Sequence, residues 1–329
     1  MNMLLQHSQA ESDLKSQFVA ARSGSILAPL THLGVLAFSG EDAQAFLQGQ
    51  LTCDVAAVGL GAGSYGAYCS PQGRMLASFL LWREETGFLM ALSRDILPAV
   101  RKRISMFVLR SKVKITDASE SLVLFGVAGA RAAATLRGIF SELPAALNEV
   151  RGQTGVGTSI KLNDGRFFLA LAAPSAAPLR EQLADGLKAV EASVWRWLDL
   201  RSGVPLITAA TQDRFVPQMA NLDLLGGISF SKGCYTGQEI VVRMQHLGKP
   251  KRRMFLANVA AEAAAGDDLY SEDLGNQANG MIVNAEASPD GGHDALAVVQ
   301  IASRRNSTVH LKSLDGPALR FLPLPYPIA

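Results

Sequence analysis

The residues best placed for chemistry lie between Ser231 and Gln245, in the run SKGCYTGQEIVVRMQ. Lys232 precedes Cys234 by two positions, and the adjacent glycines allow backbone conformations that other residues resist. A neighbouring cation and a helix N-terminus both favour the thiolate, which is the nucleophilic form of cysteine. The sequence therefore predicts that Cys234 ionises more readily than an isolated cysteine. A buried, inert cysteine is the alternative.

A helix is expected to follow this loop, because Ile240, Val241 and Met244 recur at helical spacing from Thr236 onward. Basic side chains cluster at its end and beyond: Arg243, His246, Lys249, Lys251, Arg252 and Arg253. Cations complement the C-terminal end of a helix dipole, so a solvated helix end is one interpretation. The other is an anion site that binds a glutamate tail or RNA phosphate.

The composition is typical of a compact globular protein of two or three domains. The 329 residues are 48% hydrophobic and 18% charged, and no apolar run reaches the roughly 18 residues of a membrane span. The N-terminal residues lack a basic segment followed by a sustained apolar stretch, so the cytoplasm is the expected compartment. A formal net charge of +2 gives no global nucleic-acid signature.

The cysteines and histidines are scattered along the chain. Cys53, Cys69 and Cys234 form no CxxC pair, which fits a reducing compartment better than a disulfide framework. The five histidines show no metal-ligand spacing. The sequence therefore predicts no dedicated metal site, while a transient ligand role for Cys234 stays open.

Alternating strand and helix patterns predict an α+β fold with antiparallel sheets covered by helices. The expected strands lie at 34–39, 112–116, 122–127 and 167–172, with a β-meander over 64–92 that turns at 71–73. The expected helices lie at 39–48, 93–110, 131–140, 179–190 and 195–201. From residue 254 onward, short apolar runs separated by Gly, Asp, Asn and Pro predict a small all-β barrel or sandwich.

The segment KGCYTGQE, from Lys232 to Glu239, resembles the signature of the YgfZ family of folate-binding proteins, which are relatives of the glycine-cleavage T-protein. The similarity extends to residues 39–55, 201–230 and 322–326. It implies a GcvT-like α+β fold with two interleaved α+β domains, antiparallel sheets and a small C-terminal β-barrel. The implied organisation is an N-terminal tail at 1–24, a folate-binding region at 25–250 and the barrel at 251–329.

The same resemblance implies tetrahydrofolate or a one-carbon derivative as the cofactor. Trp195 aligns with one tryptophan that the family assigns to folate binding, whereas the second falls at Leu33. Leucine supplies an apolar wall without aromatic stacking, so weaker or differently posed folate binding is expected. The further candidate binding residues are Gln218, Tyr235, Gln238, Glu239 and Arg243. Helix capping is the alternative role of Gln238 and Glu239.

The family resemblance also implies support of iron–sulfur enzyme assembly or repair and, through it, of tRNA modification. A tRNA methylthiotransferase is one such partner, and Cys234, assisted by Lys232, is the expected working residue. Aminomethyltransferases of the superfamily carry a paired aspartate after a glycine-rich turn, where this chain has Ala77 and Ser78. The difference argues against conventional aminomethyl transfer, because a positioned acid or base is typically worth about 10²- to 10⁴-fold in rate.

Two alternatives stay open on the sequence. A folate-dependent aminomethyltransferase or demethylase would need a carboxylate from another position. A tRNA-binding module would use the basic residues from Arg243 to Arg253, and steeply salt-dependent binding would identify it.

Overall fold

The computed structural model describes residues 2–162, 165–246 and 250–328, which form two compact units. The first unit comprises Met1–Thr31 and Ser119–Leu198, and the second comprises His32–Ala118 and Asp199–Ala329. Each unit joins two separate stretches of the chain, which confirms the predicted interleaving. The domain boundary predicted at residue 250 stays a prediction.

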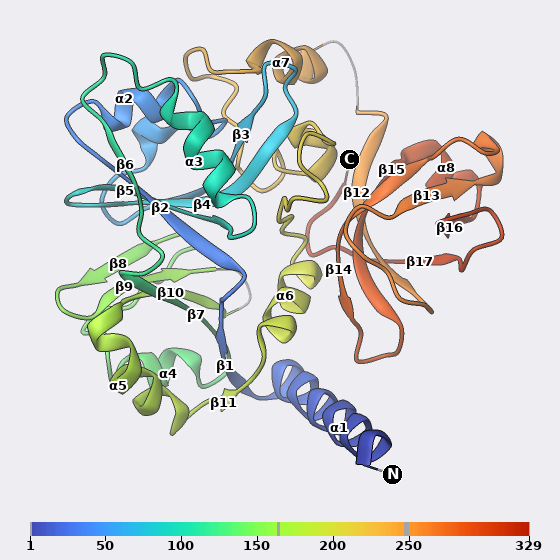
Figure 1. The fold of residues 1–329 in the computed structure, drawn as a ribbon, viewed down its shortest axis with the longest axis horizontal. Coiled ribbons are helices and arrows are strands. Elements are labelled where there is room, and N and C mark those ends of the chain that lie inside the picture. Colours follow the sequence, from blue (N-terminus) through green and yellow to red (C-terminus); the bar gives the residue numbers. More distant parts are fainter. Residues whose placement is uncertain (1, 163–164, 247–249, 329) are drawn as a thin grey trace. The chain divides into compact units, whose positions relative to one another are not determined.

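The first unit is built on a six-stranded sheet with the order β11-β1-β7-β10-β9-β8. Its strands are β1 (Ser25–Pro29), β7 (Leu122–Gly129), β8 (Val150–Gln153), β9 (Gly157–Lys161), β10 (Phe167–Ala172) and β11 (Lys188–Ala189). The blue strand β1 pairs with the green strand β7, so the two stretches of chain meet inside one sheet (Figure 1). Helices α4 (Ala132–Leu136) and α5 (Ala173–Ala184) contribute apolar side chains to the same core.

Two further helices belong wholly or partly to the first unit. Helix α1 (Asn2–Ser23) occupies the segment predicted as a tail, and its Phe18 ring meets the Trp197 ring edge-on, with 5.4 Å between ring centres. The Gln17 side chain accepts a hydrogen bond of 2.7 Å from the Glu191 amide. Helix α6 (Ala192–Arg201) then leads the chain into the second unit.

The second unit contains a five-stranded antiparallel sheet with the order β3-β4-β5-β2-β6. Its strands are β2 (Leu33–Ser39), β3 (Gly63–Cys69), β4 (Met75–Glu84), β5 (Gly87–Ser93) and β6 (Lys114–Asp117). The predicted β-meander is confirmed as β3, β4 and β5. The helices of this part are α2 (Ala43–Gln48), η1 (Val55–Ala57) and α3 (Leu97–Ser105). Leu47 of α2 and Ile104 of α3 are fully buried in the core.

A second sheet of this unit has the order β16-β13-β14-β15-β12-β17 and curls into a half-barrel (Figure 1). Its strands are β12 (Arg252–Val259), β13 (Asp268–Ser271), β14 (Gly280–Ala287), β15 (His293–Gln300), β16 (Val309–Leu311) and β17 (Leu319–Leu322). A register shift between Ile282 and Asn284 bends β14, as β-bulges do. The predicted all-β character is confirmed, with the short helices η3 (Glu272–Leu274) and α8 (Ile301–Asn306) added.

Several helices differ in their bounds from the sequence prediction. The helices expected at 39–48 and 131–140 are shorter, at Ala43–Gln48 and Ala132–Leu136. The helix expected at 93–110 is confined to α3, because the Arg94 amide still donates to the His32 carbonyl at the end of the sheet (2.9 Å). The helix expected at 179–190 begins earlier, at Ala173, with Pro174 in the first turn, where its missing N–H costs no helical hydrogen bond. None of the helices among the described residues is long and apolar enough to cross a bilayer.

Candidate functional site

The KGCYTGQE loop is fastened to the second unit through its lysine. The Lys232 Nζ donates hydrogen bonds to the carbonyl oxygens of Leu51 (2.7 Å) and Cys53 (2.9 Å) and lies 5.1 Å from the centre of the Tyr235 ring. Burial lowers the pKa of the Lys232 ammonium, and the nearby Cys53 opposes this shift. Lys232 therefore anchors the loop, and its assistance to Cys234 stays a prediction.

Two glycines hold this loop against the turn between β3 and β4. Gly237 has a φ of +82° and Gly73 a φ of +71°. A Cβ atom on Gly237 would lie 2.5 Å from the Ser70 carbonyl oxygen, and one on Gly73 would lie 2.9 Å from the Ile240 Cβ. Glycine permits both the close approach and the left-handed backbone. This contact could not be predicted from the sequence, because nothing local in either segment indicates the other.

The expected helix is confirmed as α7 (Gln238–His246). The Gln238 Oε1 accepts a hydrogen bond from the Tyr235 amide (3.3 Å), so the capping role considered for Gln238 is present. Glu239 is exposed in the first turn, where a carboxylate complements the helix dipole. Cys234 is also exposed and precedes the helix in the chain.

An open hollow of about 570 Å³ lies at this loop. It is lined by Pro71, Cys234, Tyr235, Thr236, Gly237, Gln238, Glu239 and Val242. Four of the predicted site residues therefore share one surface. Pro71 and Val242 are lining residues that the sequence analysis missed, and the predicted turn at 71–73 was the only signal for the first.

The three cysteines differ sharply in their surroundings. Cys53 and Cys69 are buried, whereas Cys234 is exposed. Burial raises the pKa of Cys53 to about 11 and that of Cys69 to about 12. Both buried thiols therefore stay protonated at neutral pH, and Cys234 is the thiol that reagents can reach. Among the described residues, no group of three His, Cys, Asp or Glu side chains is placed to hold a metal ion.

Tyr235 is buried, although the residue before it in the chain, Cys234, is exposed. The Tyr235 side chain is 6% exposed, and its hydroxyl finds no hydrogen-bond partner in the described part of the chain. Burial, with a smaller contribution from Cys69, raises the pKa of the Tyr235 phenol. A buried polar atom without a partner is uncommon in folded proteins, so this hydroxyl stands out in the site.

Gln218 lies inside the second unit, in the short helix η2 (Pro217–Ala220). The side-chain Nε2 of Gln218 donates a hydrogen bond to the Val241 carbonyl oxygen of α7 (2.6 Å). The backbone carbonyl oxygen of Gln218 accepts a hydrogen bond from the Arg253 guanidinium (2.7 Å). The Gln218 Oε1 has no partner among the described residues. The side chain thus positions α7, and its contact with a folate stays a prediction.

The basic residues predicted as a cluster after the loop lie in different environments. Arg253 donates two hydrogen bonds to the Asp223 carboxylate (2.6 and 2.8 Å), with both side chains largely buried, so its charge is neutralised. Arg243 is exposed on α7. Lys249 and the side chain of His246 lie outside the described residues.

Trp195 lies in the first unit and is 1% exposed. A Cβ atom on Gly126 would lie 2.3 Å from its ring, and the Arg166 Cζ lies 5.1 Å from the ring centre. The indole therefore packs against backbone and a guanidinium group. In the second unit, Leu33 is half-buried at the start of β2. The folate contacts assigned to Trp195 and Leu33 stay predictions.

Ala77 and Ser78 occupy the position at which aminomethyltransferases are expected to carry a paired aspartate. The Ser78 hydroxyl has a structural role. The Ser78 Oγ donates to the Pro205 carbonyl oxygen and accepts from the Ile207 amide, both at 2.9 Å. The neighbouring Ala77 is fully buried. This part of β4 therefore supplies no carboxylate.

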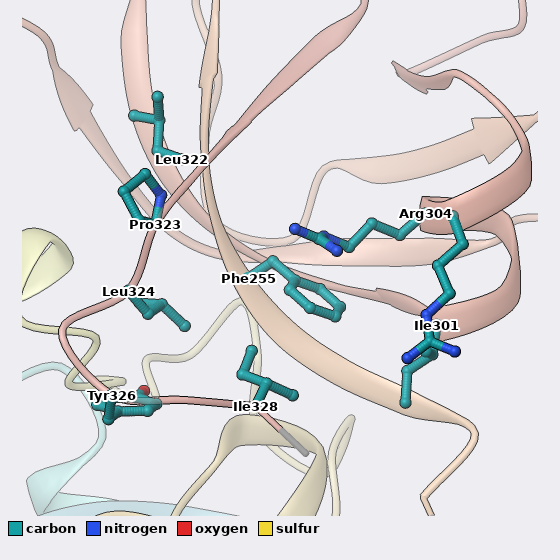
Figure 2. A pocket seen from close by; sticks show the side chains of 9 residues that line it. Phe255, Ile301, Arg304, Leu322, Pro323, Leu324, Tyr326 and Ile328 are labelled. Carbon is teal, nitrogen blue, oxygen red and sulfur yellow. The ribbon is translucent and has the colours of Figure 1, made fainter.

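A second cavity, of about 220 Å³, lies beside the C-terminal sheet (Figure 2). It is lined by Phe255, Ile301, Arg304, Arg305, Leu322, Pro323, Leu324, Tyr326 and Ile328. The Arg304 guanidinium points toward the Phe255 ring, with its Cζ 4.4 Å from the ring centre (Figure 2). This cavity contains none of the predicted site residues, so the hollow at the KGCYTGQE loop is the candidate site.

Comparison with known proteins first gives the class of protein. The family model of the GCVT N-terminal domain matches residues 4–154. The crystal structure of glycine cleavage system aminomethyltransferase T from Bartonella henselae matches with a TM-score of 0.79, covering 95% of this chain and 89% of that chain at 19% identity. The protein therefore has the fold of the glycine-cleavage aminomethyltransferases.

Sequence relatives define the family more narrowly. The tRNA-modifying protein YgfZ of Sodalis glossinidius (strain morsitans) is 33% identical over 306 residues, which are 92% of this chain and 93% of the relative. The tRNA-modifying protein YgfZ of Enterobacter sp. (strain 638) is 34% identical over 311 residues, which are 93% and 95% of the two chains. The chain belongs to the YgfZ family, which confirms the resemblance seen in KGCYTGQE.

Proposed function

We propose that this protein binds a reduced folate and serves tRNA modification by supporting the assembly or repair of iron–sulfur enzymes. The observation that carries the proposal is the similarity to the YgfZ relatives, which are named as tRNA-modifying proteins and match over more than nine-tenths of this chain. The exposed Cys234, within the candidate site, is the proposed working residue.

The hollow at the KGCYTGQE loop has the chemistry that a folate requires. Its volume falls within the roughly 300–1,000 Å³ of typical small-molecule sites. Val242 supplies an apolar wall, and Gln238 and Glu239 supply polar groups for the ring edge. Arg243 does not line the hollow, but it is exposed on the same helix, α7, and is the proposed cation for the glutamate carboxylates. A bound reduced folate would supply one-carbon chemistry.

The folate part is tested by calorimetric titration of the purified protein with tetrahydrofolate under anaerobic conditions. Glu239→Gln and Arg243→Ala are expected to weaken binding about tenfold each, because a charge-assisted contact is typically worth about 1.5–3 kcal/mol. Arg320→Ala, which removes an exposed cation on β17, is the control that leaves affinity unchanged. Absence of binding at millimolar folate rejects a folate site.

The role in tRNA modification is tested by complementation of a bacterial strain that lacks its own YgfZ-family gene. The wild-type protein is expected to restore methylthiolated nucleosides in tRNA, measured by mass spectrometry, and Cys234→Ala is expected to fail. Cys53→Ala is the matched control for a thiol that is buried. Full rescue by Cys234→Ala rejects the thiol role, and failure of the wild-type protein rejects the tRNA role.

Folate-dependent aminomethyl transfer is the competing function, favoured by the fold alone. Ser78 is committed to backbone hydrogen bonds, so a carboxylate would have to come from elsewhere in the site. Formation of methylene-tetrahydrofolate from an aminomethyl donor would support this function. Its absence at saturating folate would exclude it.

A further inference from the structure

The stretch between Asp95 and Asp117 carries six basic residues and no acidic one. They are Arg101, Lys102, Arg103, Arg110, Lys112 and Lys114. This concentration contrasts with the formal net charge of +2 for the whole chain. The local surplus therefore sets this part of the second unit apart from the rest.

The packing of α3 turns its cations outward. Leu97, Val100 and Ile104 are buried in the core, whereas Arg101 and Lys102 are exposed. Cations near the end of a helix complement its dipole, so α3 alone would need no further explanation. The helix dipole does not explain the residues after α3, where apolar side chains are exposed among the cations.

The loop from 106 to 113, between α3 and β6, exposes large apolar side chains in the middle of these cations. Met106 is 60% exposed, Phe107 is 40% exposed and Leu109 is 88% exposed. Leu109 also has a φ of +45°, a left-handed conformation that leucine rarely adopts. Elsewhere in the described chain, side chains of this kind are exposed singly along the sequence. Their grouping here contributes nothing to the core.

The cations beside this loop are available to a ligand. Lys112 pairs with Glu41 at 2.7 Å, but both side chains are more than two-thirds exposed, so the pair is weak. No carboxylate of the described residues forms an ion pair with Arg101, Lys102 or Arg110. The segment thus combines unpaired positive charge with exposed apolar groups.

We infer that the α3–β6 segment, residues 101–114, is an RNA-docking surface, with cations on phosphates and Phe107 against an unpaired base. Proteins that bind single-stranded or looped RNA combine these two kinds of contact. The choice of RNA rests on the proposed function, since the relatives are named as tRNA-modifying proteins. The cluster after α7 is the weaker candidate, because Arg253 is neutralised by Asp223.

The inference is tested with unfractionated tRNA in a fluorescence-anisotropy titration at several salt concentrations. Arg101→Glu combined with Lys102→Glu is expected to lower the affinity at least tenfold and to reduce the slope of log affinity against log salt by about 2. Phe107→Ala is expected to lower the affinity about tenfold with little change in that slope. Thermal unfolding confirms that each variant is folded.

Arg131→Glu combined with Arg137→Glu is the matched control, because it reverses the same number of exposed cationic charges beside α4, away from the α3–β6 segment in the chain. An equal loss of affinity in this control would show that tRNA binding depends only on the net charge of the protein, and it would overturn the inference. Binding of the wild-type protein to vesicles with phosphatidylglycerol, but not to tRNA, would assign the surface to lipid and also overturn it. If the protein does not bind tRNA but still binds folate and still complements the mutant strain, the RNA-docking inference is rejected and the proposed function stands.

Discussion

Trp195 and Cys234 are the two residues that the family resemblance singles out most clearly, and the structure gives them opposite environments. Trp195 is 1% exposed and packs against Gly126 and Arg166 in the first unit. Cys234 is exposed on a loop of the second unit that glycines and Lys232 hold in place. The same family resemblance thus points to one side chain inside a packed core and to one side chain open to solvent. Their roles in binding stay predictions that different experiments must test.

The largest effect is expected at Trp195. Trp195→Ala should lower the free energy of unfolding by about 3–5 kcal/mol, because it leaves a cavity in a packed core. Chemical denaturation measures this change, and Trp195→Phe, which keeps an aromatic ring, should cost less. A Trp195→Ala protein that stays equally stable but loses folate binding would break the comparison and make Trp195 a ligand residue.

A smaller loss is expected at the glycine contact under Cys234. Gly237→Ala should destabilise the protein by about 1–3 kcal/mol, because the new methyl group meets the Ser70 carbonyl oxygen at a positive φ. Gly233→Ala is the matched control in the same loop, since nothing lies within 4 Å of its added Cβ. Equal melting temperatures for the two variants would show that the loop is not clamped at Gly237.

Alkaline pH should weaken the folded state through the two buried thiols, Cys53 and Cys69. The pKa of Cys53 is raised from 9.0 to about 11 and that of Cys69 to about 12, so folding favours the neutral thiol. This stabilisation is complete below pH 9 and is lost as the pH rises from 9 toward the folded values. By pH 10, each thiol should lower the free energy of unfolding by roughly 1 kcal/mol.

The measurement is denaturant unfolding between pH 8 and 10. Cys69→Ser should flatten the dependence on pH, because it removes one of the two buried thiols. A stability that is constant over this range would contradict the burial of both thiols.

The smallest effect is expected at Cys234 itself. Cys234→Ala should change the free energy of unfolding by no more than about 0.5 kcal/mol, as for most exposed substitutions. Intact-mass analysis after brief alkylation at neutral pH should show one modified thiol in the wild-type protein and none in this variant. Modification of more than one thiol in the folded protein would mean that Cys53 or Cys69 is reachable.

Local patterns predicted much of the fold, and contacts between distant segments account for what they missed. The alternation over 64–92 predicted β3 to β5, and the spacing after Thr236 predicted α7. The pairing of Arg253 with Asp223 left no local trace, so a cluster that appeared uniformly basic proved partly neutralised. The Gly73–Gly237 contact is equally invisible, because the close approach of two distant segments leaves no mark in the local sequence of either.

The anchoring of Lys232 to the carbonyl oxygens of Leu51 and Cys53 has a consequence for how the protein is made. The first of these hydrogen bonds joins residues 181 positions apart. At the roughly 5–20 residues per second of ribosomal synthesis, the carbonyl groups emerge on the order of 10–40 s before the lysine that will bind them. The candidate site therefore cannot be completed during most of translation. A ribosome that stalls before residue 232 leaves a nascent chain whose β-meander lacks its covering loop, so such a chain should bind chaperones more strongly than the finished protein.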